Sequence, residues 1–190
     1  MSSNTAAKTP ANTTTKTRMM VQIAMLTAVA EVLMLFDFPL PFAPSFYKID
    51  LSEVPILIGC FAMGPAAGII IEAMKILLNF IISGTVTAGV GELANFAIGC
   101  SMVLPAGLIY RYHKTRKNAV LGMAAGTLVM AAIGGLLNAF VLLPAYAALF
   151  GGMDAIIGMG TAVNKNITSV QSFVLLSVVP FNLVKGVIVS

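Results

Sequence analysis

Long runs of apolar residues, broken only at charged or turn-forming positions, constrain this chain more than any other feature. A helix needs about 20 mostly apolar residues to cross a hydrocarbon core of about 30 Å, and several such helices fit in 190 residues. Charged residues make up only 9% of the chain, against roughly 25% in a soluble domain. Since such a surface cannot face water, we predict an all-α polytopic membrane protein, a single bundle of six transmembrane helices.

The breaks between apolar runs divide the chain. Residues 1–17 are polar and have no apolar face, so we expect a disordered cytoplasmic tail there. Residues 18–190 are expected to form one six-helix transmembrane domain. Its first five spans are predicted at 19–38, 51–63, 65–82, 92–109 and 118–149.

The start of the sixth span is ambiguous. After a polar, glycine-containing stretch at 151–168, the span either occupies 171–190 or begins at Pro180. Proline is favoured at the first helical position, which supports a start at Pro180. The chain also ends on apolar residues without a polar or basic anchor. We therefore favour the later start and expect a last helix that is truncated at residue 190.

Lysine and arginine predict the orientation. Alternating the sides of successive loops puts the basic residues of the N-terminus on the same side as those of the loop at 111–117, whereas the opposite loops hold only Lys48 and Lys165. Basic residues favour the cytoplasmic side of a membrane. We therefore predict a multi-pass protein of the cell membrane with a cytoplasmic N-terminus.

Ionisable residues lie within the predicted spans. At the centre of a span each costs about 2.5–3.5 kcal/mol on insertion scales and needs a specific role. Glu72 and Lys75 are three residues apart, so we expect them to form an ion pair on one helix face. Glu31 has no evident partner in the sequence. Lys185 follows Asn182 by three residues and is harder to explain by packing.

Polar side chains converge on the predicted outer side. They are Lys48, Asp50, Glu92, Asn95, Asn138, Asn182 and Lys185. Amides and an ammonium between helices, surrounded by phenylalanine and methionine, suit a neutral, flat molecule with a polar edge. The alternative is that these residues end loops and extend towards the lipid headgroups.

The sequence gives little support for a catalytic, metal or nucleic-acid site. The chain has no P-loop motif, so we expect no ATP hydrolysis, and it has no catalytic constellation of serine, histidine and aspartate. Cys60 and Cys100 both lie in apolar segments and suit neither a disulfide framework nor a metal site. The chain has no basic run with interleaved aromatic residues, the pattern that would predict nucleic acid as a partner. We expect neither an enzyme nor a bound cofactor or metal.

A pair of small residues, Ala24 and Ala28, lies four apart on the first span. Such pairs let a second helix approach closely in lipid. In an alanine-rich chain the pattern alone is weak evidence for a helix-docking face.

Three motifs carry a family resemblance. They are Phe-Tyr-Lys-Ile-Asp ending at Asp50, Gly-Glu-Leu-Ala-Asn-Phe around Glu92 and Asn95, and Pro-Phe-Asn-Leu-Val-Lys ending at Lys185. In this order they resemble the riboflavin-specific S components of energy-coupling factor (ECF) vitamin importers, over nearly the whole chain.

The resemblance implies both a mechanism and site residues. S components have six helices and bind a vitamin near the outer face, while a transmembrane coupling subunit and two cytoplasmic ATPases drive import. It implies that Asn182 and Lys185 address the polar edge of the flavin, with Glu92, Asn95, Asn138, Lys48 and Asp50 as further ligands. It also implies that Ala24 and Ala28 dock onto the coupling subunit.

The resemblance leaves two alternatives open. The chain could be an S component for another vitamin or precursor, or a membrane scaffold without a transported ligand. Because a single lysine is a weak basis for a phosphate site, we expect free riboflavin to be preferred over its phosphate.

Overall fold

The computed structural model describes residues 11–190 except 42, 45 and 86, and of residues 11–14 only the backbone. Helices account for most of it. The elements are α1 (Ala11–Leu35), β1 (Phe38–Pro39), β2 (Lys48–Ile49), α2 (Glu53–Met63), α3 (Pro65–Ser83), α4 (Val90–Tyr112), α5 (Arg116–Leu137), the π-helical turn η1 (Asn138–Leu142), α6 (Leu143–Phe150), α7 (Met153–Val163), α8 (Val170–Phe173), the π-helical turn η2 (Val174–Val178) and α9 (Val179–Val189).

Five helices in the described part are long and apolar enough to cross a membrane. They are α1, α3, α4, the continuous helix from α5 to α6, and the continuous helix from α8 to α9. The helix predicted as the second span is α2, which is apolar but has only 11 residues. The helical membrane architecture is therefore present, whereas the count of six spans stays a prediction.

The N-terminal helix is longer than we expected. It begins at Ala11, so residues 11–17 of the predicted tail belong to a helix. Residues 1–10 of the predicted tail lie outside the described residues. At the other end of the chain, the stretch at 151–168 contains the short helix α7.

The prediction that the last span begins at Pro180 was wrong. A single helix runs from Val170 to Val189, as the alternative start at residue 171 had predicted to within one residue. Proline lacks an N–H group, and its ring collides with the carbonyl one turn earlier. Here the turn just before the proline is the wider π-helical turn η2, and η1 lies in the same position before Pro144. A bulge of this kind adjusts the hydrogen-bond ladder where a regular helix would break or kink.

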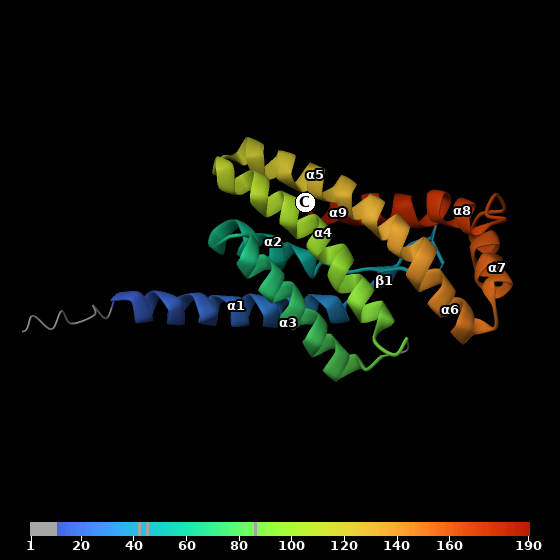
Figure 1. Ribbon diagram of the computed structural model, residues 1–190, viewed down its shortest axis with the longest axis horizontal. Helices are drawn as coiled ribbons and strands as arrows, with labels where there is room; N and C mark the ends of the chain where they lie inside the picture. The colour runs from blue at the N-terminus through green and yellow to red at the C-terminus, as the bar shows by residue number, and fades with distance from the viewer. Residues whose placement is uncertain (1–10, 42, 45, 86) are drawn as a thin grey trace, which may run out of the picture.

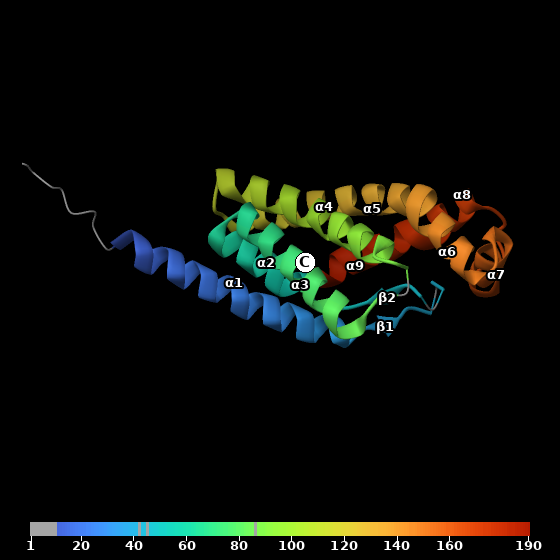
Figure 2. The same cartoon turned by 60° about the horizontal axis from the view of Figure 1, so that its bottom comes forward.

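The helices lie side by side along the long axis (Figures 1 and 2). One end of the bundle carries the first turns of α1, the α2–α3 turn and the basic α4–α5 turn. The other end carries the β1–β2 hairpin, the α3–α4 loop, α6, α7 and α8. The polar residues expected to bind a ligand therefore belong to segments at, or leading to, this second end.

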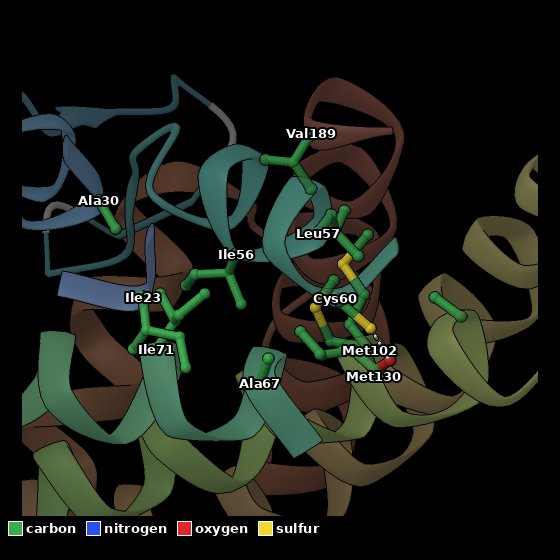
Figure 3. Close-up of a cluster of buried hydrophobic side chains, with 12 residues drawn as sticks. Ile23, Ala30, Ile56, Leu57, Cys60, Ala67, Ile71, Met102, Met130 and Val189 are labelled. Atoms are coloured by element: carbon green, nitrogen blue, oxygen red, sulfur yellow. Dashed lines mark hydrogen bonds between the residues drawn. The ribbon is translucent and has the colours of Figure 1, made fainter. Parts of the chain in front are cut away.

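Two apolar clusters hold the bundle together. The larger one joins α1, α2, α3, α4, α5 and α9 around buried side chains such as Ile56, Ile71, Met102 and Met130 (Figure 3). The other cluster, around Ile49, Leu143 and Phe173, packs the hairpin against α6, α7 and α8.

The α4–α5 pair is packed through glycine. A Cβ atom at Gly122 would lie 2.8 Å from the Ala106 carbonyl oxygen, and one at Gly126 would collide with the Met102 carbonyl. The two backbones therefore touch directly, as small residues allow in membrane helices.

Candidate functional site

A cavity of about 630 Å³ opens between the hairpin, the α3–α4 loop and the helices α1, α3, α4, α6 and α9. Its walls contain all seven side chains that we predicted to bind a ligand: Lys48, Asp50, Glu92, Asn95, Asn138, Asn182 and Lys185. These residues come from five separate elements or loops, and the fold brings them to one site. A cavity of this size fits a small molecule of the class that concave, mostly apolar sites bind.

An ion pair forms the charged part of the cavity wall. The Lys185 ammonium lies 3.3 Å from Asp50 Oδ2, and both side chains are buried. The Ser52 backbone N–H donates to the other carboxylate oxygen, Asp50 Oδ1, at 2.8 Å. Burial alone would raise the pKa of Asp50, but the ammonium groups of Lys185 and Lys75 and the hydrogen bonds from Ser52 hold that pKa below its usual value. The carboxylate thus stays charged at neutral pH and fixes the position of Lys185.

Two buried amides lie beside the ion pair. Asn138, in η1, donates through Nδ2 to the Gly134 carbonyl at 2.7 Å, and its oxygen accepts a hydrogen bond from the Tyr47 hydroxyl. Asn182 donates through Nδ2 to the Val178 carbonyl at 2.9 Å. Because each amide donates to a carbonyl of its own helix, its orientation is set before any ligand arrives. Burial raises the pKa of Tyr47, which therefore remains a hydrogen-bond donor at neutral pH.

Aromatic rings form an apolar wall. The Phe46 ring lies 4.7 Å from Tyr47 and 5.4 Å from Tyr146, measured between centroids. Tyr47 in turn lies 5.2 Å from Phe181. Such tilted contacts stabilise aromatic clusters and present flat faces for stacking.

The remaining predicted residues lie nearer the mouth. Glu92, in the first turn of α4, accepts a hydrogen bond from the Thr85 hydroxyl at 3.1 Å. Asn95 lies one turn further along the same helix and is partly buried. Lys48 forms an exposed ion pair with Asp37 at 3.0 Å, linking the strand β2 to the segment after α1. The Lys48–Asp37 pair is thus far more exposed than the Asp50–Lys185 pair.

Several residues of the cavity were missed at the sequence level. Tyr47, Asn79, Thr87 and Tyr146 also line it. Asn79 could have been found, because it follows Lys75 by four residues and therefore lies on the same helix face. It donates to Glu31 Oε1 at 3.2 Å and so provides the partner that Glu31 lacked in the sequence.

Ala24 and Ala28 do not line the cavity. Both are exposed on α1, whereas their neighbours Ile23, Thr27 and Ala30 are buried against the bundle. The two alanines therefore form a small-residue face that points away from the rest of the protein.

A family model for the substrate-specific component of ECF transporters matches residues 18–190. The chain belongs to this family. An ECF S component is a transport protein and not an enzyme, and the five apolar helices make this one a multi-pass membrane protein.

Similar proteins cover nearly the whole S component. The riboflavin transporter RibU of Staphylococcus aureus (strain TCH60) is 35% identical over 171 residues, which are 90% of this chain and 84% of the relative. The riboflavin transporter FmnP of Bacillus subtilis (strain 168) is 33% identical over 176 residues, 92% of this chain and 87% of the relative. A solved structure described as the S component of a bacterial ECF transporter superposes with a TM-score of 0.72 at 35% identity, over 92% of this chain and 89% of that one.

Proposed function

We propose that this S component captures riboflavin from outside the cell and delivers it for import. The observation that carries the proposal is the composition of the cavity. Amides and one ammonium lie beside an aromatic wall, in a space of about 630 Å³. The names of the relatives from Staphylococcus aureus and Bacillus subtilis support the same ligand.

Riboflavin matches this arrangement group by group. Its flat tricycle can stack on Phe46 and Phe181, and one edge of the ring carries carbonyl oxygens that accept from the Lys185 ammonium and from amides such as Asn182. Its polyhydroxyl tail then extends towards Glu92 and Asn95, which offer both acceptors and donors.

The chain has no P-loop motif with which to hydrolyse ATP itself. We propose that a transmembrane coupling subunit and two cytoplasmic ATPases of an ECF module supply the energy. On the positive-inside rule the basic α4–α5 turn and the N-terminus are cytoplasmic, which puts the cavity on the outer side. The helix α2 then serves as the short sixth span.

Titration of the purified, detergent-solubilised protein into riboflavin tests the ligand. We expect saturable one-to-one quenching of flavin fluorescence, because stacked aromatic rings quench an enclosed flavin. Thiamin and biotin should not compete, and riboflavin phosphate should bind more weakly, because Lys185 is already paired with Asp50.

Riboflavin that stays free and fluorescent would contradict the proposal. A screen of other vitamins would then distinguish an S component for a different ligand from a scaffold that binds none.

The exposed small-residue face of α1 makes a separate prediction. Replacing both Ala24 and Ala28 with leucine should lower riboflavin uptake by the assembled transporter at least tenfold, because bulky side chains prevent close helix approach. Riboflavin binding by the isolated S component should be unchanged, since neither alanine lines the cavity. Uptake into proteoliposomes and fluorescence titration measure the two quantities.

The variant Val29→Leu is the matched control, because Val29 is also exposed on α1 but is already large. Normal uptake by the double leucine variant would remove the docking role of this face. Loss of flavin binding as well would make the face a structural one.

A further inference from the structure

A charged cluster is fully buried between α2, α3 and α4. The Lys75 ammonium lies 3.1 Å from Glu53 Oε1 and 2.9 Å from Glu72 Oε2, and all three side chains are at most 1% exposed. The backbone of α4 closes over them, since a Cβ atom at Gly99 would collide with the Glu72 carboxylate. Two carboxylates thus share one ammonium, and none of the three side chains lines the cavity.

This cluster is connected to the cavity by hydrogen bonds. Lys75 also donates to Ser52 Oγ at 3.2 Å. The backbone N–H of the same Ser52 donates to Asp50 Oδ1 at 2.8 Å, and Lys185 donates to Asp50 Oδ2 at 3.3 Å. Four residues from three parts of the fold therefore form one chain of contacts, which begins in the interior at Lys75 and ends at the cavity wall at Lys185.

The chain of contacts constrains both carboxylate oxygens of Asp50. One carboxylate oxygen binds the Ser52 N–H and the other faces Lys185, so rotation of the carboxylate would break one of the two contacts. Ser52 is itself fully buried and is held by Lys75 through its hydroxyl. The position of Lys185 thus depends on Lys75, which does not line the cavity.

We propose that Lys75 is a positioning residue for ligand capture, which acts through Ser52 and Asp50 to hold the Lys185 ammonium at the cavity wall. The inference rests on the proposed binding of riboflavin, and it assigns a function to a buried cluster that ligand contact alone leaves unexplained. Lys75 supplies both the hydrogen bond to Ser52 and part of the positive potential at Asp50.

A double-mutant cycle tests the connection. Ser52→Ala removes the hydroxyl that links Lys75 to the Asp50 segment, and we expect riboflavin affinity to fall about tenfold, which corresponds to about 1.4 kcal/mol. In the background of Lys185→Met, the same Ser52→Ala change should have less than a twofold effect, because the residue on which it acts is gone. Fluorescence titration of the four proteins gives the coupling.

Lys75 itself is tested with a charge-balanced variant. Lys75→Met combined with Glu53→Gln and Glu72→Gln leaves no unpaired buried charge, and its affinity should also fall about tenfold. The control Glu72→Gln keeps Lys75 bound to Glu53 and Ser52, so affinity should stay within twofold of wild type. Multiplicative effects of Ser52→Ala and Lys185→Met, or wild-type affinity of the charge-balanced variant, would overturn the inference.

The pH profile supplies a readout that packing alone would not change. Asp50 faces Lys185 on α9, Lys75 on α3 and, more weakly, Glu31 on α1. Because its pKa is lowered, its ion pair with Lys185 persists at neutral pH and is lost as pH falls through that lowered pKa. Without Lys75 the pKa of Asp50 rises. The riboflavin affinity of the charge-balanced variant should therefore begin to fall at a higher pH than that of wild type. Identical profiles would contradict the role of Lys75.

The same cycle on the unliganded protein separates this inference from the proposed function. The contacts exist without a ligand, so Ser52→Ala and Lys185→Met should also be non-additive in their effect on the melting temperature. If wild type binds no riboflavin, the proposed function fails. Non-additive effects on the melting temperature would then retain the link between Ser52 and Lys185, and additive effects would remove it.

Discussion

Lys185→Ala is expected to weaken riboflavin binding about 100-fold. A hydrogen bond to a charged group contributes about 1.5–3 kcal/mol, a factor of roughly 10 to 150 in affinity. The substitution also leaves the buried Asp50 carboxylate without its ammonium, so a negative charge faces the carbonyl edge of the flavin. Asn182→Ala in the same background should reduce binding further, because it removes a second donor from the same wall. Fluorescence titration measures both variants.

The cavity offers a matched control lysine. Lys48→Ala also removes an ammonium that lines the cavity, but this one is half exposed and paired with Asp37. Exposed ion pairs contribute about 0–1 kcal/mol, so we expect less than about a threefold loss of affinity. Equal losses for Lys48→Ala and Lys185→Ala would show that net charge, and not the position of Lys185, governs binding.

Lys75→Met alone is expected to destabilise the folded protein by about 3–5 kcal/mol, the usual cost of breaking a buried ion pair by removing one partner. The change leaves Glu53 and Glu72 buried and uncompensated, and among the described residues Glu53 Oε2 and both carboxylate oxygens of Glu72 already lack a hydrogen-bond partner. The yield of monodisperse protein in size-exclusion chromatography and the melting temperature in a thermal unfolding scan would both fall.

The charge-balanced variant is the counterpart of this experiment. With Glu53→Gln and Glu72→Gln added, most of the lost stability should return, because no charge is left unpaired. Lys114→Met, in the exposed α4–α5 turn, should leave the melting temperature unchanged. A stable, well-folded Lys75→Met protein would mean that the cluster contributes little to folding.

Polar residues within apolar runs made much of this site predictable. Membrane burial makes each such residue costly, so Asn138, Asn182 and Lys185 stood out, and all three line the cavity. The Glu72–Lys75 pair followed from spacing on one helix and is confirmed.

Contacts between distant segments were not predictable in this way. Glu53 pairs with Lys75 from another helix, and Tyr47 reaches Asn138 across 91 positions of sequence. Local periodicity carries no information about such partners. The predicted helix start at Pro180 was wrong for a related reason. It followed from a local rule about prolines at helix starts, whereas the packed bundle contains a helix that continues through this proline.

The two π-helical turns have a consequence for the direction of side chains. In an α-helix each residue advances about 100° around the axis, and a π-helical turn takes up one extra residue, so it places everything downstream about 100° away from where a regular helix of the same sequence would place it. Asn182 and Lys185 follow η2, and their azimuth therefore depends on it. If the segment 174–178 became regular α-helix with no residue removed, these two side chains would rotate by about 100° away from the cavity, whereas deleting one residue from it would leave their direction unchanged. Their direction towards the cavity thus depends on the π-helical form of the preceding turn, as well as on their own chemistry.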